Sequence, residues 1–202
     1  MTEQALDQRI YALSERDTIV FMAAMVERML INFRFYIAVC PFDNARRADS
    51  AMGLVWEALT TRQARIDFGL QSEKLAVFEQ SFEEQGDESF GGQMAGDALL
   101  ALSILLETLA TERKGGAIEI ARLSRHGVIR LITLQDDDQH ENDALDALID
   151  EHPLMSDERD FEASVLAQIE QEGSVTRDAI RELRRLGRNE GVSNLGLSLE
   201  EV

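Results

Sequence analysis

The residues with the clearest chemical potential lie in an apolar, helix-periodic stretch over residues 17–39. Glu27 and Arg34 are seven positions apart there, which places them on one helix face together with Ala23 and Ala38. A glutamate on such a helix is either paired or shifted in its titration by desolvation. It could therefore handle a proton or bind a ligand, or it could form an ion pair with an arginine such as Arg34 that fixes how the helices dock. The ion pair is favoured, because structural pairs also perturb titration.

Other acidic side chains in helix-periodic stretches have simpler explanations. Glu57 follows the single tryptophan, Trp56, and lies on the side of its helix that we expect to face solvent. Asp97 is expected in the first turn of an apolar helix, where the helix dipole favours a negative charge. Glu107 is the other acid on that helix. None of the three requires a catalytic explanation.

No metal site and no cofactor are predicted. A carboxylate-bridged metal centre in a helical bundle uses Glu-x-x-His pairs, and none ends at His126, His140 or His152. The acidic run 136–143 offers oxygen ligands but lacks the glycine and the final glutamate of a calcium-binding loop, so solvated surface is the favoured interpretation. Cys40, expected at a helix C-terminus where the dipole disfavours a thiolate, is interpreted as a small core residue.

Helical periodicity and helix punctuation dominate the chain. They predict an all-α fold, a single compact bundle of eight or nine helices forming one domain over residues 1–202. The stretch 93–110 is apolar nearly all round, which is typical of a central, buried helix. The expected helices cover residues 3–13, 17–39, 43–61, 69–85, 93–110, 117–134, 143–151, 156–171 and 174–189, with Ser174 as the cap of the last.

The negative charge is concentrated in one segment. The 202 residues carry a net charge of −18, and residues 133–172, the acidic segment, hold 14 acidic side chains and one basic one. An Arg-rich C-terminal helix at 174–189 follows directly. Its basic stripe predicts docking onto the acidic segment, within the chain or across a dimer; the outer face of 117–134 is a second candidate surface. These two basic surfaces consist of Arg177, Arg181, Arg184 and Arg188, and of Arg122, Arg125, His126 and Arg130.

Composition also limits the compartment and the partners. The chain opens on polar residues without a signal-peptide pattern, and its longest apolar run, 19–26, is far shorter than the roughly 20 residues of a membrane span. One cysteine fits a reducing compartment. We therefore expect a cytoplasmic protein with no membrane partner. Nucleic acid is an unlikely partner class, because a strongly acidic chain repels phosphate backbones.

Several short motifs follow one another in a fixed order along most of the chain. They are Phe21–Met29, Leu54–Thr60, Glu73-Lys74 before a Phe-Glu pair, Asp97-Ala98 before Ala101-Leu-Ser103, and Ser193–Gly196 after an Arg-rich helix. With them the sequence resembles the YjaG-like family of bacterial proteins, a group classified only as a domain of unknown function. The resemblance implies an all-α fold and a bacterial cytoplasmic setting, and it brings no activity or catalytic residues. It draws attention to six motif positions: Glu27, Arg28, Trp56, Glu57, Ser193 and Asn194.

Three hypotheses about function follow. The first is a non-enzymatic helical module for protein interaction or regulation, acting as a homodimer or on another protein. The second is a small-molecule-binding protein or enzyme that uses Glu27 in a pocket between helices. The third is that the acidic segment mimics nucleic acid and occupies a basic protein.

Overall fold

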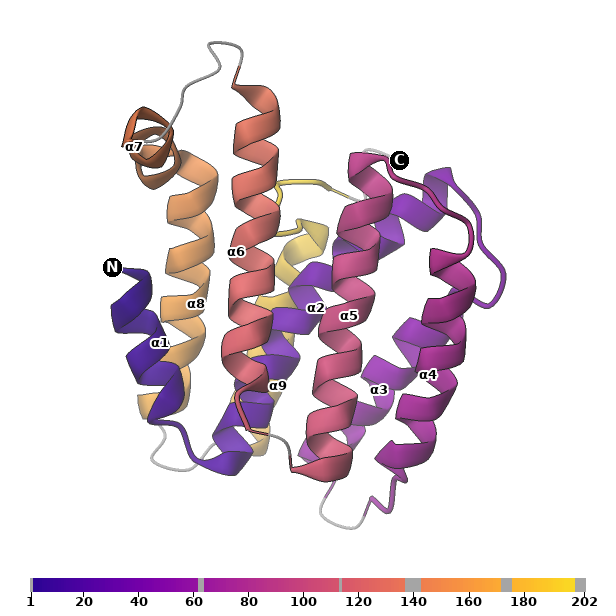
Figure 1. Ribbon diagram of the computed structural model, residues 1–202. Helices are drawn as coiled ribbons and strands as arrows, with labels where there is room; N and C mark the ends of the chain where they lie inside the picture. Colours follow the sequence, from indigo (N-terminus) through magenta and orange to yellow (C-terminus); the bar gives the residue numbers. More distant parts are fainter. Residues whose placement is uncertain (1, 62–63, 113, 137–142, 172–175, 199–202) are drawn as a thin grey trace.

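A computed structural model describes residues 2–61, 64–112, 114–136, 143–171 and 176–198. Within these ranges the chain forms nine α-helices and a short 3-10 turn, and the prediction of an all-α bundle is confirmed (Figure 1). The helices are α1 (Glu3–Tyr11), α2 (Glu15–Val39), α3 (Arg46–Thr60), α4 (Phe68–Glu83), α5 (Phe90–Thr111), α6 (Gly116–Gln135), α7 (Asp143–Glu151), α8 (Pro153–Gln171) and α9 (Arg177–Arg188), followed by the 3-10 turn Asn189–Gly191.

Helices α2 and α5 form the centre of the bundle. In Figure 1, α2 runs diagonally behind α5 and α6. Every residue of α2 from Val20 to Phe33 is buried, because other helices cover it on all sides along this stretch. The length and apolar composition of α5 would by themselves allow it to cross a membrane, but 56% of that stretch is buried inside the bundle. The central position predicted for this helix is confirmed.

Side-chain caps set several helix boundaries, and one of them corrects the sequence analysis. The Ser89 hydroxyl accepts a hydrogen bond from the Gly92 backbone N–H, so α5 begins at Phe90, three residues earlier than expected. Asp97 is consequently the eighth residue of α5, and its predicted place in the first turn is wrong. At the last helix, the side chain of Thr176 caps α9; the expected cap, Ser174, lies outside the described residues.

Helix α9 packs close to α2 because a glycine faces α2 at the contact. A methyl group at Gly187 would lie 2.8 Å from the backbone oxygen of Ala24 and 3.2 Å from the Cβ of Glu27. Arg184, three residues before Gly187, and Arg188, directly after it, are thereby held beside Glu27. The fold thus brings two arginines of the basic stripe of α9 to the one acidic residue in the buried part of α2.

Candidate functional site

Glu27 is a fully engaged, buried carboxylate facing α3 and α9. It is 1% exposed. Its Oε2 accepts a hydrogen bond from the indole Nε1 of Trp56 at 2.7 Å. Its Oε1 accepts from Arg34 at 3.1 Å and from the Nε of Arg188 at 3.4 Å. The ion pair with Arg34, expected from the seven-residue spacing, is confirmed, and the carboxylate also holds α3 and α9 against α2.

A pocket opens directly beside this carboxylate. Its cavity of about 370 Å³ lies between α2, α3 and α9, which is within the size range of small-molecule sites. The wall combines charged groups with apolar side chains and two glycines. It is lined by Glu27, Ile31, Arg34, Asp49, Met52, Gly53, Arg184, Arg188 and Gly191.

The charges lining the pocket do not balance. Three guanidinium groups face two carboxylates, those of Glu27 and Asp49. Arg34 serves both acids, since its Nε also donates to Asp49 at 2.8 Å. Arg184 has the weakest partnership, with its Nε 4.0 Å from Glu27 Oε2 and no hydrogen-bond acceptor. The pocket therefore carries an excess positive charge, in a chain whose net charge is −18.

Arg184 is in an environment that disfavours its charge. Burial is the largest cause that lowers the pKa of Arg184, and the charges of Arg188 and Arg34 lower it further, against the opposing effect of Glu27. Its guanidinium carbon lies 5.7 Å from the centre of the Trp56 ring, which adds a weak cation–π contact. The group remains partly open to the pocket, with 36% of its side chain exposed.

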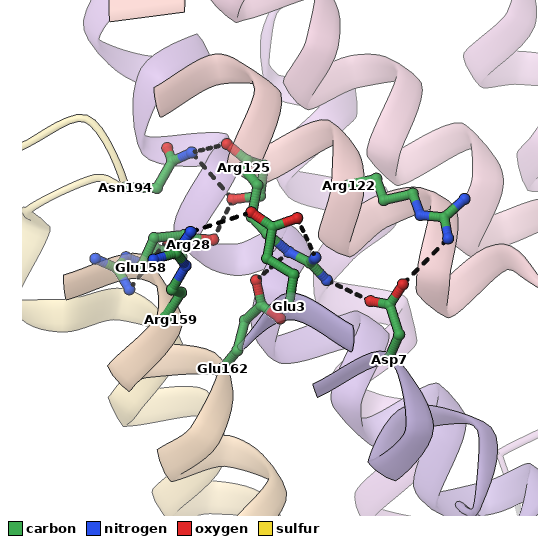
Figure 2. A network of polar contacts seen from close by, with 10 residues as sticks. Glu3, Asp7, Arg28, Arg122, Arg125, Glu158, Arg159, Glu162 and Asn194 are labelled. Atoms are coloured by element: carbon green, nitrogen blue, oxygen red, sulfur yellow. Dashed lines mark hydrogen bonds and ion pairs between the residues drawn. The ribbon is translucent and has the colours of Figure 1, made fainter. Parts of the chain in front are cut away.

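A second polar network joins α1 and α8 to α6, and Figure 2 shows it from close by. Its centre is Arg125, whose side chain is 2% exposed. The Arg125 guanidinium donates to Glu162 of α8 at 2.9 Å and to Glu3 and Asp7 of α1 at 3.2 and 2.7 Å. Burial and the neighbouring Glu158 raise the pKa of Glu162 well above its ordinary range, although Arg125 opposes the shift. These ion pairs hold α1 and α8 against α6.

Arg28 extends the second network toward the C-terminal tail. Its guanidinium lies 3.4 Å from Glu158 Oε2 and stacks over the Phe161 ring at 4.2 Å. Glu158 also accepts a hydrogen bond from Ser124, and the Ser124 hydroxyl accepts one from Asn194 at 3.0 Å. Arg28 thus faces α8, although it directly follows Glu27.

The tail segment Ser193–Gly196 anchors the chain end. The Ser193 hydroxyl accepts backbone N–H bonds from Leu195 and Leu197, which closes a tight turn. Asn194 accepts from Asn32 of α2 at 2.8 Å and donates to the Ser124 backbone oxygen at 3.2 Å. Both motif residues are buried and have structural partners.

The six motif positions therefore separate into three locations. Glu27 and Trp56 meet at the pocket, whereas Arg28, Ser193 and Asn194 belong to the second network and the tail. Glu57 is exposed, as expected.

Three details differ from the sequence-based expectations. The sequence pattern places Arg125 on the outer face of its helix, but the residue is buried, because acids of α1 and α8 enclose it. Cys40, expected to be a core residue, is exposed at the C-terminal end of α2. The pocket residues Asp49, Arg184 and Arg188 were not connected with Glu27; the i, i+4 spacing of the two arginines was the available signal.

The predicted docking of the acidic segment onto the Arg-rich helix is not what the described residues show. The acids of α8 pair with Arg9, Arg28 and Arg125. The arginines of α9 for which contacts are resolved pair with Glu27 or with acids of their own helix, Asp178 and Glu182. Most of the acidic run 136–143, residues 137–142, lies outside the described part. Within that part, no group of three or more metal-ligating side chains is close enough to hold an ion.

Comparisons with known proteins agree with this architecture. A family model described as "Protein of unknown function (DUF416)" matches residues 5–198. The chain is 26% identical to "Uncharacterized protein YjaG" of Escherichia coli K12 across the full length of both, and 27% identical to an "Uncharacterized protein" of Haemophilus influenzae across 97% and 98% of the two chains. A crystal structure of a DUF416 family protein from Shewanella baltica superposes with a TM-score of 0.85 at 27% identity, covering 95% of this chain and 97% of that one.

Proposed function

The chain belongs to the DUF416 family of bacterial proteins of unknown function, and we propose that it is a binding protein for a small molecule, held in the pocket between α2, α3 and α9. The observation that carries the proposal is the position of Glu27 in the wall of a cavity of about 370 Å³. A buried carboxylate that served only to dock helices would need no open cavity beside it. We place this role in the cytoplasm.

The arrangement of Glu27 supports binding and not acid–base catalysis. Both carboxylate oxygens already accept hydrogen bonds, from Trp56 on one side and from Arg34 and Arg188 on the other. A general base needs an oxygen within reach of a substrate proton. Glu27 is better suited to hold the arginines in position for a ligand.

Filling the pocket tests this proposal. Gly53 lines the pocket, and a methyl group there would meet no atom of another segment within 4 Å. Gly53→Leu should therefore fold normally while its side chain occupies the cavity. The measurement is a thermal-shift screen of wild type and variant against organic acids, organic phosphates, amines and neutral sugars.

The control for that screen is Gly53→Ala, which changes helix propensity in the same direction but adds only one methyl group. We expect compounds that stabilise wild type to stabilise Gly53→Ala and to leave Gly53→Leu unchanged. If the same compounds stabilise both variants equally, ligands bind elsewhere and the assignment of the pocket is wrong.

A protein partner is a second candidate, because part of the acidic segment faces solvent. Asp143, Asp146, Asp157 and Asp160 of α7 and α8 are exposed. This surface would suit a basic patch on another protein or on a second copy of the chain. Light scattering at several protein and salt concentrations tests self-association. A strict monomer that captures no basic partner would argue against this candidate.

A further inference from the structure

We propose that the molecule bound in the pocket carries an oxyanion group, a carboxylate or a phosphate, held by Arg184 together with Arg188 and Arg34. The inference rests on the proposed function, since it names the chemical class of ligand for the same pocket.

The first argument is the charge balance at the pocket. Glu27 distributes its two oxygens among Trp56, Arg34 and Arg188, and Asp49 is bound by Arg34. Arg184 is left with only the distant contact to Glu27, 4.0 Å from its Nε to Oε2. A singly charged anion would bring the local charge of three cations and two anions to zero, whereas a cation would meet three guanidinium groups.

The second argument is the unused hydrogen-bonding capacity of Arg184. Its Nε is buried and donates to no acceptor, and its separation from Glu27 Oε2, 4.0 Å, exceeds hydrogen-bond length. A buried donor without an acceptor is destabilising, and more so when the group is charged. Carboxylate and phosphate oxygens match the planar fork of donors on a guanidinium. An oxyanion would supply the missing acceptor.

The third argument is the rigid placement of the arginines. The close contact of Gly187 with Ala24 fixes α9 on α2. Arg188 is held by Glu27 on one side of this contact, and Arg184 lies one helical turn earlier over the Trp56 ring. Guanidinium groups held in place before binding lose less conformational freedom when an anion arrives.

The uncharged part of the pocket indicates the rest of the ligand. Ile31, Met52 and Gly53 also line it, and they offer apolar contact without further charge. The ligand class is therefore a small organic acid or organic phosphate with an apolar body.

The single tryptophan provides a direct readout. Trp56 donates to Glu27 and lies under Arg184, so an anion that binds Arg184 changes the electric field at the indole ring. We expect saturable changes in Trp56 fluorescence on titration with inorganic phosphate or succinate. The titrations are run against sodium chloride at equal ionic strength, which removes general screening effects. Triethylammonium and glycerol serve as the cationic and neutral probes.

Three variants locate the response. Arg184→Gln should weaken binding of the anionic probes by about tenfold or more, because it removes a charge-assisted bond. Arg181→Gln, on the same helix but paired with the exposed Asp178, should bind like wild type. Gly53→Leu should abolish the response by filling the cavity.

The outcomes separate the two proposals. A saturable response to phosphate or succinate that is lost in both Arg184→Gln and Gly53→Leu supports both the pocket and the oxyanion class. Saturation by the neutral or cationic probe alone, abolished by Gly53→Leu, overturns the oxyanion class and leaves the pocket proposal intact. An anion response that persists in Arg184→Gln places the anion elsewhere and overturns the inference. A complete lack of response to every probe also overturns it.

Discussion

Glu27 gives the pocket its shape because one carboxylate organises partners from three helices. Trp56 on α3, Arg34 on α2 and Arg188 on α9 all donate to it. Removing one partner from a buried ion pair is costly because the remaining charges lose their compensation. The same residue therefore contributes both to stability and to the position of the pocket arginines.

Glu27→Gln should lower the free energy of unfolding by about 3 kcal/mol, since the arginines around the pocket lose a buried countercharge. Urea denaturation followed by circular dichroism measures the change. The control is Glu57→Gln on the exposed side of α3, which we expect to change stability by less than about 0.5 kcal/mol. Equal effects of the two substitutions would show that Glu27 is not the electrostatic centre described above.

Glu79 makes stability depend on pH. Burial raises the pKa of Glu79 to about 7, with a smaller contribution from the charge of Glu83, although the hydrogen bond from Ser103 opposes the shift. Folding thus favours the protonated carboxyl. Its contribution to stability is complete below the ordinary value of 4.5 and is lost as the pH rises through about 7.

Glu79→Gln should match wild type at about pH 5 and exceed it by about 1 kcal/mol at about pH 8, after allowance for solvent screening. Denaturation curves at both pH values measure this difference. Glu73→Gln, exposed on the same helix, provides the control and should show no such divergence. A stability difference that narrows as the pH rises would contradict the sign.

At the level of elements, α9 is placed by one close approach to α2. Gly187→Ala puts a methyl group 2.8 Å from the Ala24 backbone oxygen, and backbone cannot easily move away. We expect a loss of about 1–3 kcal/mol from overpacking, although alanine favours the helix. Gly53→Ala is the matched helical control, with open space around the added methyl group, and should be neutral or stabilising by up to about 1 kcal/mol. Chemical denaturation measures the free energy of unfolding of both variants. A Gly187→Ala variant more stable than wild type would show that α9 can move away from α2.

The packing of helix α1 against the bundle depends on the ion pairs of Arg125. Arg125→Met keeps much of the side-chain volume but leaves Glu162 buried beside Glu158, and we expect a loss of about 3–5 kcal/mol. Hydrogen exchange should show loss of protection in α1. Arg122→Met is the control, since Arg122 also pairs with Asp7 but is 60% exposed, and it should cost less than about 1 kcal/mol. Retained protection of the α1 amides in Arg125→Met would show that Arg125 does not hold α1 in place.

Much of this architecture could be predicted from the sequence because helix signals are local. The end of α2 at Val39 and the bounds of α7 match the expected positions. Periodicity also indicated that Glu27 and Arg34 share a face. It could not show that α9 lies across that face, because the approach depends on Gly187 meeting Ala24, residues 163 positions apart along the chain. For the same reason Arg125 was assigned to an exposed face, since its acidic partners come from α1 and α8.

On the scale of the whole molecule, the net charge of −18 hides a local reversal of sign. Most of the net negative charge belongs to residues 133–172, which hold 14 acidic side chains and one basic one and are far along the sequence from the α2 and α3 walls of the pocket. The basic stripe of α9, expected to meet that segment, instead supplies two of the three pocket arginines. An anion that reaches the pocket enters a positive site on an otherwise acidic protein, which gives selectivity by charge as well as by shape.

The most direct test of the proposed site is anomalous diffraction from crystals soaked in tungstate, an oxyanion with a strong anomalous signal. We expect a tungstate ion between α2, α3 and α9, within hydrogen-bond distance of Arg184, and no such peak in crystals of Gly53→Leu. Tungstate bound only at exposed basic side chains such as Arg46 and Arg47, with the pocket free of it, would contradict the assignment.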